Sequence, residues 1–206
     1  MNSENPYDRK YAGEEYYWGK TPSSMCAKVL EFADAVGSKC PKLIDLGSGE
    51  GRDAVHFAQH GFDVTALELS PVGVEKTIRL AVDSGVSVTA IQGDIFTCEL
   101  QNNHYDVIFS TGTLHYLPPD IRRDRFDHFK NATVPGGINA QMVFVEKPFV
   151  EKAPDAEEKR YLFRSGELMS YYWDWEILFS VEEIFDCQLG DIPHRHACNR
   201  IVARKS

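Results

Sequence analysis

Three glycines at two-residue spacing are the residues of this chain best suited to binding a ligand. Residues 42–46, KLIDL, have the pattern of a short buried strand, and Gly47, Gly49 and Gly51 follow before the helical pattern of residues 52–60. Glycine lets the backbone turn with positive φ and lets a ligand lie against bare main chain. The sequence therefore predicts a strand, a glycine bend and a helix whose first N–H groups face a bound molecule.

The charge beside this bend favours a cationic ligand over a phosphate. Asp45 stands two residues before Gly47, where a carboxylate repels a pyrophosphate and attracts a positive group. A dinucleotide-binding bend has the spacing G-x-G-x-x-G, whereas the third glycine here, Gly51, comes one residue early. We predict that Asp45, Ser48 and the three glycines bind a ligand without phosphate groups. A tight turn with no ligand is the alternative.

A second carboxylate is predicted at the same edge of the sheet. Residues 62–69, FDVTALEL, have the pattern of a second strand that ends at Glu68 and Leu69. An acid at the end of the second strand of a doubly wound sheet lies close enough to accept hydrogen bonds from ribose hydroxyls. Glu68 is thus the best candidate after the glycines, with Leu69 beside it. The alternative for Glu68 is an exposed carboxylate at a strand end.

Further candidates follow the fourth predicted strand. Residues 105–110, YDVIFS, form a nearly continuous apolar run, as expected for a central parallel strand buried on both faces. Ligands in open α/β sheets bind beyond the carboxyl ends of the strands, so Ser110, Thr111 and His115 should border the reacting group. A histidine packed beneath the following helix is an equally good interpretation of His115.

Composition limits the classes of partner. The chain has 206 residues, 43% hydrophobic and 26% charged, which is typical of one soluble globular domain. A net charge of -9 argues against nucleic acid and fits a small-molecule substrate. Five cysteines without a C-x-x-C motif indicate reduced thiols, and no apolar run has the length of a membrane span. We expect a cytoplasmic protein whose oligomeric state the sequence leaves open.

The N-terminal segment differs in composition from the rest of the chain. Residues 1–20 carry four tyrosines and a tryptophan without clear periodicity. Such a segment either lays its rings over a pocket as a lid or forms a disordered tail. Residues 21–206 are predicted to form a single domain.

The bend resembles a known cofactor loop. D-L-G-S-G-E-G at residues 45–51 is similar to the loop of class I S-adenosylmethionine-dependent methyltransferases, whose ligand carries a sulfonium and an amino group and no phosphate. The resemblance implies an α/β, doubly wound, Rossmann-like sheet of seven strands, mostly parallel, with the last strand antiparallel. It also implies that Asp94 accepts from the adenine amino group and that Ile95 packs on the adenine ring. Strand and helix patterns that alternate five times before a terminal hairpin agree with that fold.

The terminal hairpin holds the densest group of ionisable side chains. If residues 175–186 run parallel to the first five strands and residues 199–205 return, the connection lies on the ligand side. There, His194, Arg195 and His196 could bind an anionic substrate, or one histidine could act as a general base. The two histidines and Cys198, on one face of an extended chain, could instead bind a metal, although a fourth ligand is missing. A solvated hairpin tip is the remaining alternative, and we place anion binding first.

Later segments narrow the resemblance to one family. W-G-K-T-P-S at residues 18–23, F-R-S-G-E-L-M-S-Y-Y at 163–172 and the ending H-R-H-A-C-N-R-I-V-A-R-K look like the tellurite-resistance methyltransferases. That family is associated with methylation of metalloid oxyanions and related small acceptors. Its members often carry D-L-G-C-G-x-G-R-N at the bend, where this chain has Ser48, Glu50 and Asp53.

The resemblance implies an in-line displacement at the sulfonium methyl group, with a tellurite, selenite or thiol acceptor. The positive charge on sulfur is lost as the bond breaks, so a pocket poor in water favours the reaction. We predict that Arg195 and the histidines position the acceptor and that no covalent enzyme intermediate is needed; the sequence assigns no metal ligands and leaves open whether a metal is required. The alternatives are a nicotinamide-dependent oxidoreductase and a catalytically silent protein that binds S-adenosylmethionine.

Overall fold

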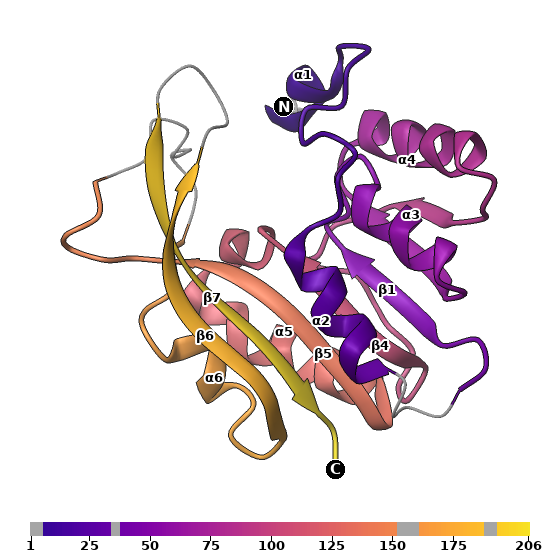
Figure 1. Cartoon of the computed structure of the whole chain (residues 1–206). Coiled ribbons are helices and arrows are strands. Elements are labelled where there is room, and N and C mark those ends of the chain that lie inside the picture. The colour runs from indigo at the N-terminus through magenta and orange to yellow at the C-terminus, as the bar shows by residue number, and fades with distance from the viewer. Residues whose placement is uncertain (1–5, 34–37, 152–160, 188–192) are drawn as a thin grey trace.

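A single seven-stranded sheet runs through the protein, and the computed structural model describes residues 6–33, 38–151, 161–187 and 193–206. The strand order is β3-β2-β1-β4-β5-β7-β6 (Figure 1). The strands are β1 (Lys42–Leu46), β2 (Asp63–Glu68), β3 (Thr89–Gln92), β4 (Tyr105–Thr111), β5 (Thr133–Val145), β6 (Glu176–Cys187) and β7 (His194–Arg204). β1 to β5 are parallel, and β7 lies antiparallel between β5 and β6. The predicted α/β sheet with an antiparallel last strand is confirmed.

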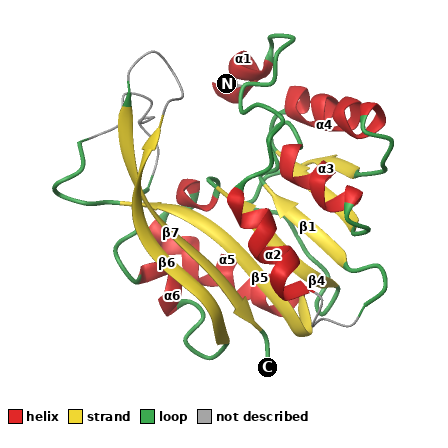
Figure 2. Ribbon diagram, viewed as in Figure 1, coloured by secondary structure: helices red, strands yellow, loops and turns green. Residues whose placement is uncertain are grey.

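Helices cover both faces of the sheet (Figure 2). They are α1 (Pro6–Tyr11), α2 (Ser24–Ala33), α3 (Arg52–Gln59), α4 (Pro71–Asp83), α5 (Pro119–Ala132) and α6 (Glu167–Ser170), with a 3₁₀-helix, η2 (Leu114–Tyr116), after β4. Ser70 caps α4 as its neighbour Pro71 suggests, because its Oγ accepts from Gly73 N at 3.2 Å. Among the described helices, none is both long and apolar enough to cross a bilayer.

Two apolar cores, one on each face, explain the runs of apolar residues in the central strands. On one face, Val29 of α2 and Phe57 of α3 pack with Phe109 of β4. On the other, Phe126 of α5 packs with Ile108, the residue before Phe109. Successive side chains of a strand point to opposite faces, so a strand covered on both sides needs apolar residues at both positions. The covered faces leave the carboxyl edge of the parallel strands as the place for a ligand.

The terminal hairpin differs from its predicted bounds. β7 begins at His194 rather than at residue 199, and the register of β6 and β7 pairs His194 with Cys187 and His196 with Phe185. The first residues of β7 alternate between half-buried and exposed positions, and their polar character hid the strand from a search for apolar runs. His194, Arg195 and His196 therefore lie on a strand and not in the connecting loop, part of which falls outside the described residues.

Candidate active site

The first and third glycines of the bend, Gly47 and Gly51, are needed because neighbouring side chains pack closely against them. Gly47 and Gly51 have φ angles of 76° and 87°. A Cβ on Gly47 would lie 2.2 Å from Thr113 Cγ2, and a Cβ on Gly51 would lie 2.6 Å from Thr77 Cγ2. Real Cβ atoms do not approach other atoms so closely, so the bare backbone lets these threonines pack against the bend. The bend thus has its shape before any ligand arrives.

Three buried carboxylates surround this bend. Asp45, Asp53 and Glu68 are 2%, 4% and 7% exposed. Burial, together with the negative charges of Asp53 and Glu68, raises the pKa of Asp45 well above its usual range. A cation bound among them would relieve this repulsion, whereas a pyrophosphate would add to it. The geometry therefore favours a cationic ligand and disfavours a nicotinamide dinucleotide.

Glu68 is held in a fixed position at the end of β2. Its Oε2 accepts from Gly49 N at 2.9 Å, and its Oε1 accepts from Ser70 N at 2.8 Å. Burial raises the pKa of this carboxyl although the two backbone bonds act in the opposite direction. A carboxylate has about four lone-pair sites, so Glu68 can still accept from ribose hydroxyls. The side chain of Leu69, the next residue, is 48% exposed and offers an apolar surface.

Asp53 is a site residue that sequence reasoning noted only as a departure from a family pattern. Its Oδ1 accepts from Ser23 N at 2.7 Å, and its Oδ2 accepts from Thr111 Oγ1 at 3.2 Å. The signal was its place in the first turn of α3, where a helix favours an acid. Asp53 thereby ties the start of α2 and the end of β4 to the bend.

The structure places the remaining cofactor candidates at the same edge of the sheet. Ser110 is buried, and its Oγ donates to Leu46 O at 2.8 Å, so it joins β4 to β1. Asp94 lies after β3 and accepts from Phe96 N at 2.9 Å through Oδ1, while Ile95 is 7% exposed. Gly93 N donates to Glu68 O at 2.9 Å, which fixes this turn beside the second carboxylate. This bond ties the turn that carries Asp94 to the end of β2.

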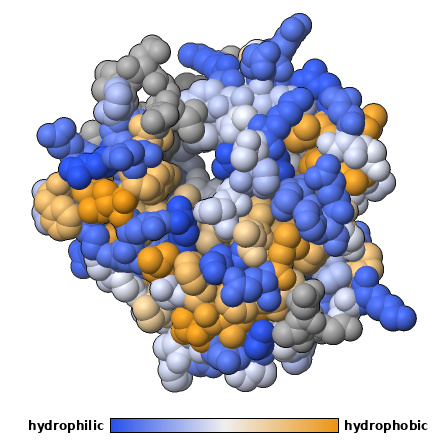
Figure 3. Space-filling model, viewed as in Figure 1, coloured by the Kyte–Doolittle hydropathy of each residue, from blue (hydrophilic) through white to orange (hydrophobic). Residues whose placement is uncertain are grey.

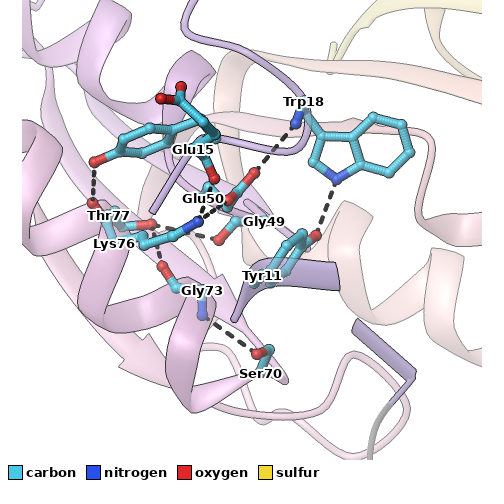
Figure 4. A network of polar contacts seen from close by, with 10 residues as sticks. Tyr11, Glu15, Trp18, Gly49, Glu50, Ser70, Gly73, Lys76 and Thr77 are labelled. Carbon is cyan, nitrogen blue, oxygen red and sulfur yellow. Dashed lines mark hydrogen bonds and ion pairs between the residues drawn. The ribbon is translucent and has the colours of Figure 1, made fainter. Parts of the chain in front are cut away.

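The aromatic N-terminal segment is fastened over the glycine bend (Figure 4). Trp18 N donates to Glu50 Oε2 at 3.2 Å, and Trp18 Nε1 donates to Tyr11 OH at 3.0 Å. Glu50 also forms a buried ion pair of 2.8 Å with Lys76 of α4, whose Nζ donates to Glu15 O at 2.6 Å. The described part of this segment, residues 6–20, is thus attached to the bend and to α4 by hydrogen bonds.

The bend fits a nucleoside that carries a positive charge and an amino group. Ser48 Oγ is buried and has no hydrogen-bond partner among the residues that the structure describes. A buried hydroxyl without a partner costs free energy, which a polar group of a ligand would recover. The polar groups needed for such a ligand are present: the Ser48 hydroxyl and the three carboxylates. These residues match the chemistry of S-adenosylmethionine.

His115 is buried next to the bend. It is 1% exposed, and its ring lies 4.5 Å from the ring of Tyr116 and 5.0 Å from that of Phe144 on β5. The carbonyl of His115 accepts from Tyr161 N at 2.8 Å. Arg122 holds the same loop, since its Nε donates to Leu117 O at 2.9 Å. His115 therefore forms part of a packed wall and does not project into open space.

The hairpin brings its two histidines together and separates them from Arg195. His194 Nε2 and His196 Nε2 lie 3.0 Å apart, and the ring of His196 packs at 4.7 Å from that of Phe144. Arg195 is exposed and pairs in register with Asp186, on the opposite face of the strand. Alternation along an extended chain predicted this separation. The histidines and Arg195 therefore do not form one joint anion site on a single face.

An aromatic row links the two regions. Tyr7 OH, from α1, lies 2.5 Å from Tyr116 OH, and His115, Phe144 and His196 continue the row onto the hairpin. Figure 3 shows the surface hollowed between the side of the hairpin and the side of the N-terminal segment. The row therefore runs from α1 in the N-terminal segment to the histidines of the hairpin.

Sequence comparisons identify relatives over most of the chain. The family model described as "Tellurite resistance protein TehB" matches residues 10–204. Hemagglutinin 1 of Eikenella corrodens is 33% identical over 150 residues, which are 70% of this chain and 47% of that protein. The probable S-adenosyl-L-methionine-dependent methyltransferase TehB of Haemophilus influenzae is 26% identical over 170 residues, 82% of this chain and 57% of that protein. The chain thus spans about half the length of these curated relatives.

Solved structures share the fold. The crystal structure of TehB from Haemophilus influenzae superposes with a TM-score of 0.75 at 23% identity, covering 87% of this chain and 62% of that one. A structure described as "Conversion of a Disulfide Bond into a Thioacetal Group during Echinomycin Biosynthesis" has a TM-score of 0.73 at 18% identity, covering 97% and 91%. At these sequence identities the superpositions show only that the fold is shared. The chemistry of the site has to be inferred from the side chains of this protein.

Proposed function

Because this chain belongs to the TehB tellurite resistance family, we propose that it transfers the methyl group of S-adenosylmethionine to a small-molecule acceptor. The observation that carries this proposal is the group of three buried carboxylates, Asp45, Asp53 and Glu68, around a bend with an unpartnered Ser48 hydroxyl among the described residues. Such a site stabilises a positive ligand and leaves no place for a pyrophosphate. The cofactor supplies an electrophilic methyl group on a sulfonium.

Different residues of the chain bind different parts of the cofactor. Glu68, fixed by two backbone N–H groups, accepts from the ribose hydroxyls, and Leu69 covers the adenine beside Asp94 and Ile95. Asp45 and Ser48 take the amino group of the methionine part. The backbone at Gly47, Gly49 and Gly51 and at Ser110 and Thr111 borders the ligand at the ends of β1 and β4.

On the acceptor side, the protein's task is to position a nucleophile and exclude water. His194 and His196 lie on the face that carries Phe144, and they orient an anionic or thiol acceptor or take its proton. Arg195, on the opposite face, adds positive charge at longer range. The N-terminal segment keeps water out, which favours a reaction that neutralises charge. Holding nucleophile, methyl and sulfur in line contributes roughly 7 to 11 kcal/mol at best.

The acceptor that this arrangement fits is small, soft and anionic: a metalloid oxyanion such as tellurite or selenite, or a thiolate. A net charge of -9 disfavours nucleic acid as the acceptor. The aromatic rings of Tyr116 and Phe144 line the path between bend and histidines, and they suit a polarisable centre better than a strongly hydrated one.

An acceptor screen tests the proposal. The purified chain is incubated with S-adenosylmethionine and tellurite, selenite, a set of thiols or small carboxylic acids, and methylated products are detected by mass. We expect methylation of at least one soft acceptor and none of the carboxylic acids. Tight binding of a reduced nicotinamide, or a complete lack of S-adenosylmethionine binding, would contradict the proposed function.

A further inference from the structure

Three side chains with metal-binding atoms converge at the tip of the β6–β7 hairpin. The Sγ of Cys187 and one ring nitrogen each of His194 and His196 all lie within 4.8 Å of one another. All three residues are half-buried on the described part of the hairpin. Sequence reasoning considered Cys198 as the sulfur partner of the histidines. The register replaces it with Cys187, which pairs with His194 across the two strands.

Cys198 lies outside this group of ligand atoms. It is fully buried and pairs in register with Glu183, further along the hairpin from its tip. Its sulfur is not among the atoms that converge at the tip. Cys187, at the hairpin tip, is half-buried instead. The cross-strand pairing, invisible in the linear spacing, thus decides which cysteine can join the histidines.

The distances match a tetrahedral ion. Two imidazole nitrogens bound to one Zn²⁺ at about 2.0–2.1 Å lie roughly 3.3–3.4 Å apart. The Nε2 atoms of His194 and His196 are 3.0 Å apart, so a small opening of the pair admits the ion. The rings of Phe144 and Phe185, with centroids 4.7 and 5.7 Å from that of His196, limit the rotation of this ligand. Two imidazoles and a thiolate suit zinc or cobalt rather than magnesium or calcium.

We propose that Cys187, His194 and His196 form a three-ligand site for Zn²⁺, with one corner of the tetrahedron left for a ligand from outside. Three protein ligands and one open position are the arrangement of zinc sites that act on substrates. Binding releases the thiol proton of Cys187 to solvent and requires each imidazole to carry its proton on Nδ1, so that Nε2 donates its lone pair to the metal.

The open corner gives the site a role in the proposed reaction. A thiol that binds Zn²⁺ loses its proton and is held as a thiolate, so with the ion bound the metal, and not a histidine acting as a base, would activate a soft acceptor at the hairpin. This second step rests on the proposed methyl transfer, whereas binding of the ion does not. The site therefore selects thiols and soft oxyanions among possible acceptors.

Metal titrations test the site without the cofactor. The metal-free chain of residues 1–206 is titrated with Zn²⁺ by calorimetry and with Co²⁺ by absorption spectroscopy. We expect one equivalent to bind, with a sulfur-to-cobalt charge-transfer band. Cys187→Ser should remove that band. Cys187→Ser and His196→Asn each remove one of the three ligands. Each should weaken Zn²⁺ binding by about 100-fold or more, because loss of a residue that only supports a ligand already costs up to about 100-fold.

The matched control is Cys40→Ser, because Cys40 is an exposed free cysteine away from the hairpin. It should bind both metals like the parent, and circular dichroism of all variants should show the parent fold. Absence of binding to the parent, or equal affinity of parent and Cys187→Ser, would overturn the site. Equal methylation of thiols with and without bound zinc would overturn only the acceptor role. A failed acceptor screen, by contrast, leaves the titration intact.

Discussion

The glycine bend and the hairpin tip face the same ligand edge but are built in opposite ways. At the bend, Glu68 and Asp53 each accept two hydrogen bonds and are less than a tenth exposed. At the hairpin, His194 and His196 are half-buried and contact each other and aromatic rings. A fully bonded site is shaped for one ligand before binding, whereas imidazoles on a partly exposed strand can accept several partners. The bend is thus fixed before any ligand binds, whereas the hairpin tip is adaptable.

The largest expected effect concerns the buried ion pair between Lys76 and Glu50. Lys76→Met leaves the carboxylate of Glu50 without its cationic partner and should lower the free energy of unfolding by about 3–5 kcal/mol. It should also speed hydrogen exchange in residues 11–18, since Lys76 no longer bonds Glu15 O. Denaturant unfolding and exchange mass spectrometry measure the two effects.

An exposed ion pair provides the control for Lys76. Lys28 and Glu31 lie 2.7 Å apart with side chains 38% and 54% exposed, so Lys28→Met should cost at most about 1 kcal/mol. If Lys28→Met and Lys76→Met lower the free energy of unfolding by similar amounts, the ion pair at the bend is no stronger than one at the surface. That result would contradict the proposed difference between the bend and the hairpin.

A second test asks whether packing or the backbone angle makes glycine necessary at the bend. Gly61 and Gly47 both have positive φ, but a Cβ on Gly61 would meet no atom within 4 Å. Gly61→Ala should cost about 1–2 kcal/mol for the left-handed conformation. Gly47→Ala should cost about 1–3 kcal/mol more, because the new methyl group would overlap Thr113. Equal losses on urea unfolding would argue against the packing role of Gly47.

The two regions also differ in how far the sequence predicts them. Glu68 and Asp45 were predicted because each ends an apolar strand, and the alternation of strands and helices predicted the sheet that brings them together. The bonds of Asp53 and the pairing of Glu50 with Lys76 join residues distant in sequence, so no local pattern signals them. Cys187 was missed for the same reason. Its neighbour on the other strand depends on the register of β6 and β7, and the sequence does not show where each strand ends and the connecting loop begins.

The dependence of cofactor affinity on pH tests the charge at the bend. Burial and two neighbouring acids raise the pKa of Asp45, so this carboxyl takes up a proton as the pH falls through its raised pKa. A cation binds the ionised form better, and S-adenosylmethionine affinity should fall by up to about tenfold per pH unit below that pKa and stay level above it. Asp45→Asn should flatten the curve measured by calorimetry. An unchanged slope in Asp45→Asn would assign the effect to another group.

The smallest effects are expected at the hairpin. His194→Ala should lower turnover on a verified acceptor by about tenfold, less than the roughly 100-fold or more that a proton-transfer group usually contributes, because His196 remains beside it. Cofactor affinity should be unchanged. Arg195→Ala should lower turnover only a few-fold, because Arg195 lies on the opposite face. Lys39→Ala, at an exposed position outside the hairpin, serves as the control. Equal losses in the His194 and Arg195 variants would contradict the separation of the two faces.

Calorimetric titration of S-adenosylmethionine into the parent, Glu68→Ala and Glu75→Ala tests the central claim most directly. Glu68 is buried at the bend, whereas Glu75 is exposed on α4 and serves as the matched control. Loss of charge-assisted bonds worth about 1.5–3 kcal/mol each should weaken binding to Glu68→Ala by about 100-fold and leave Glu75→Ala like the parent. Equal affinity in all three proteins would show that the cofactor does not lie between the glycine bend and the carboxylate of Glu68.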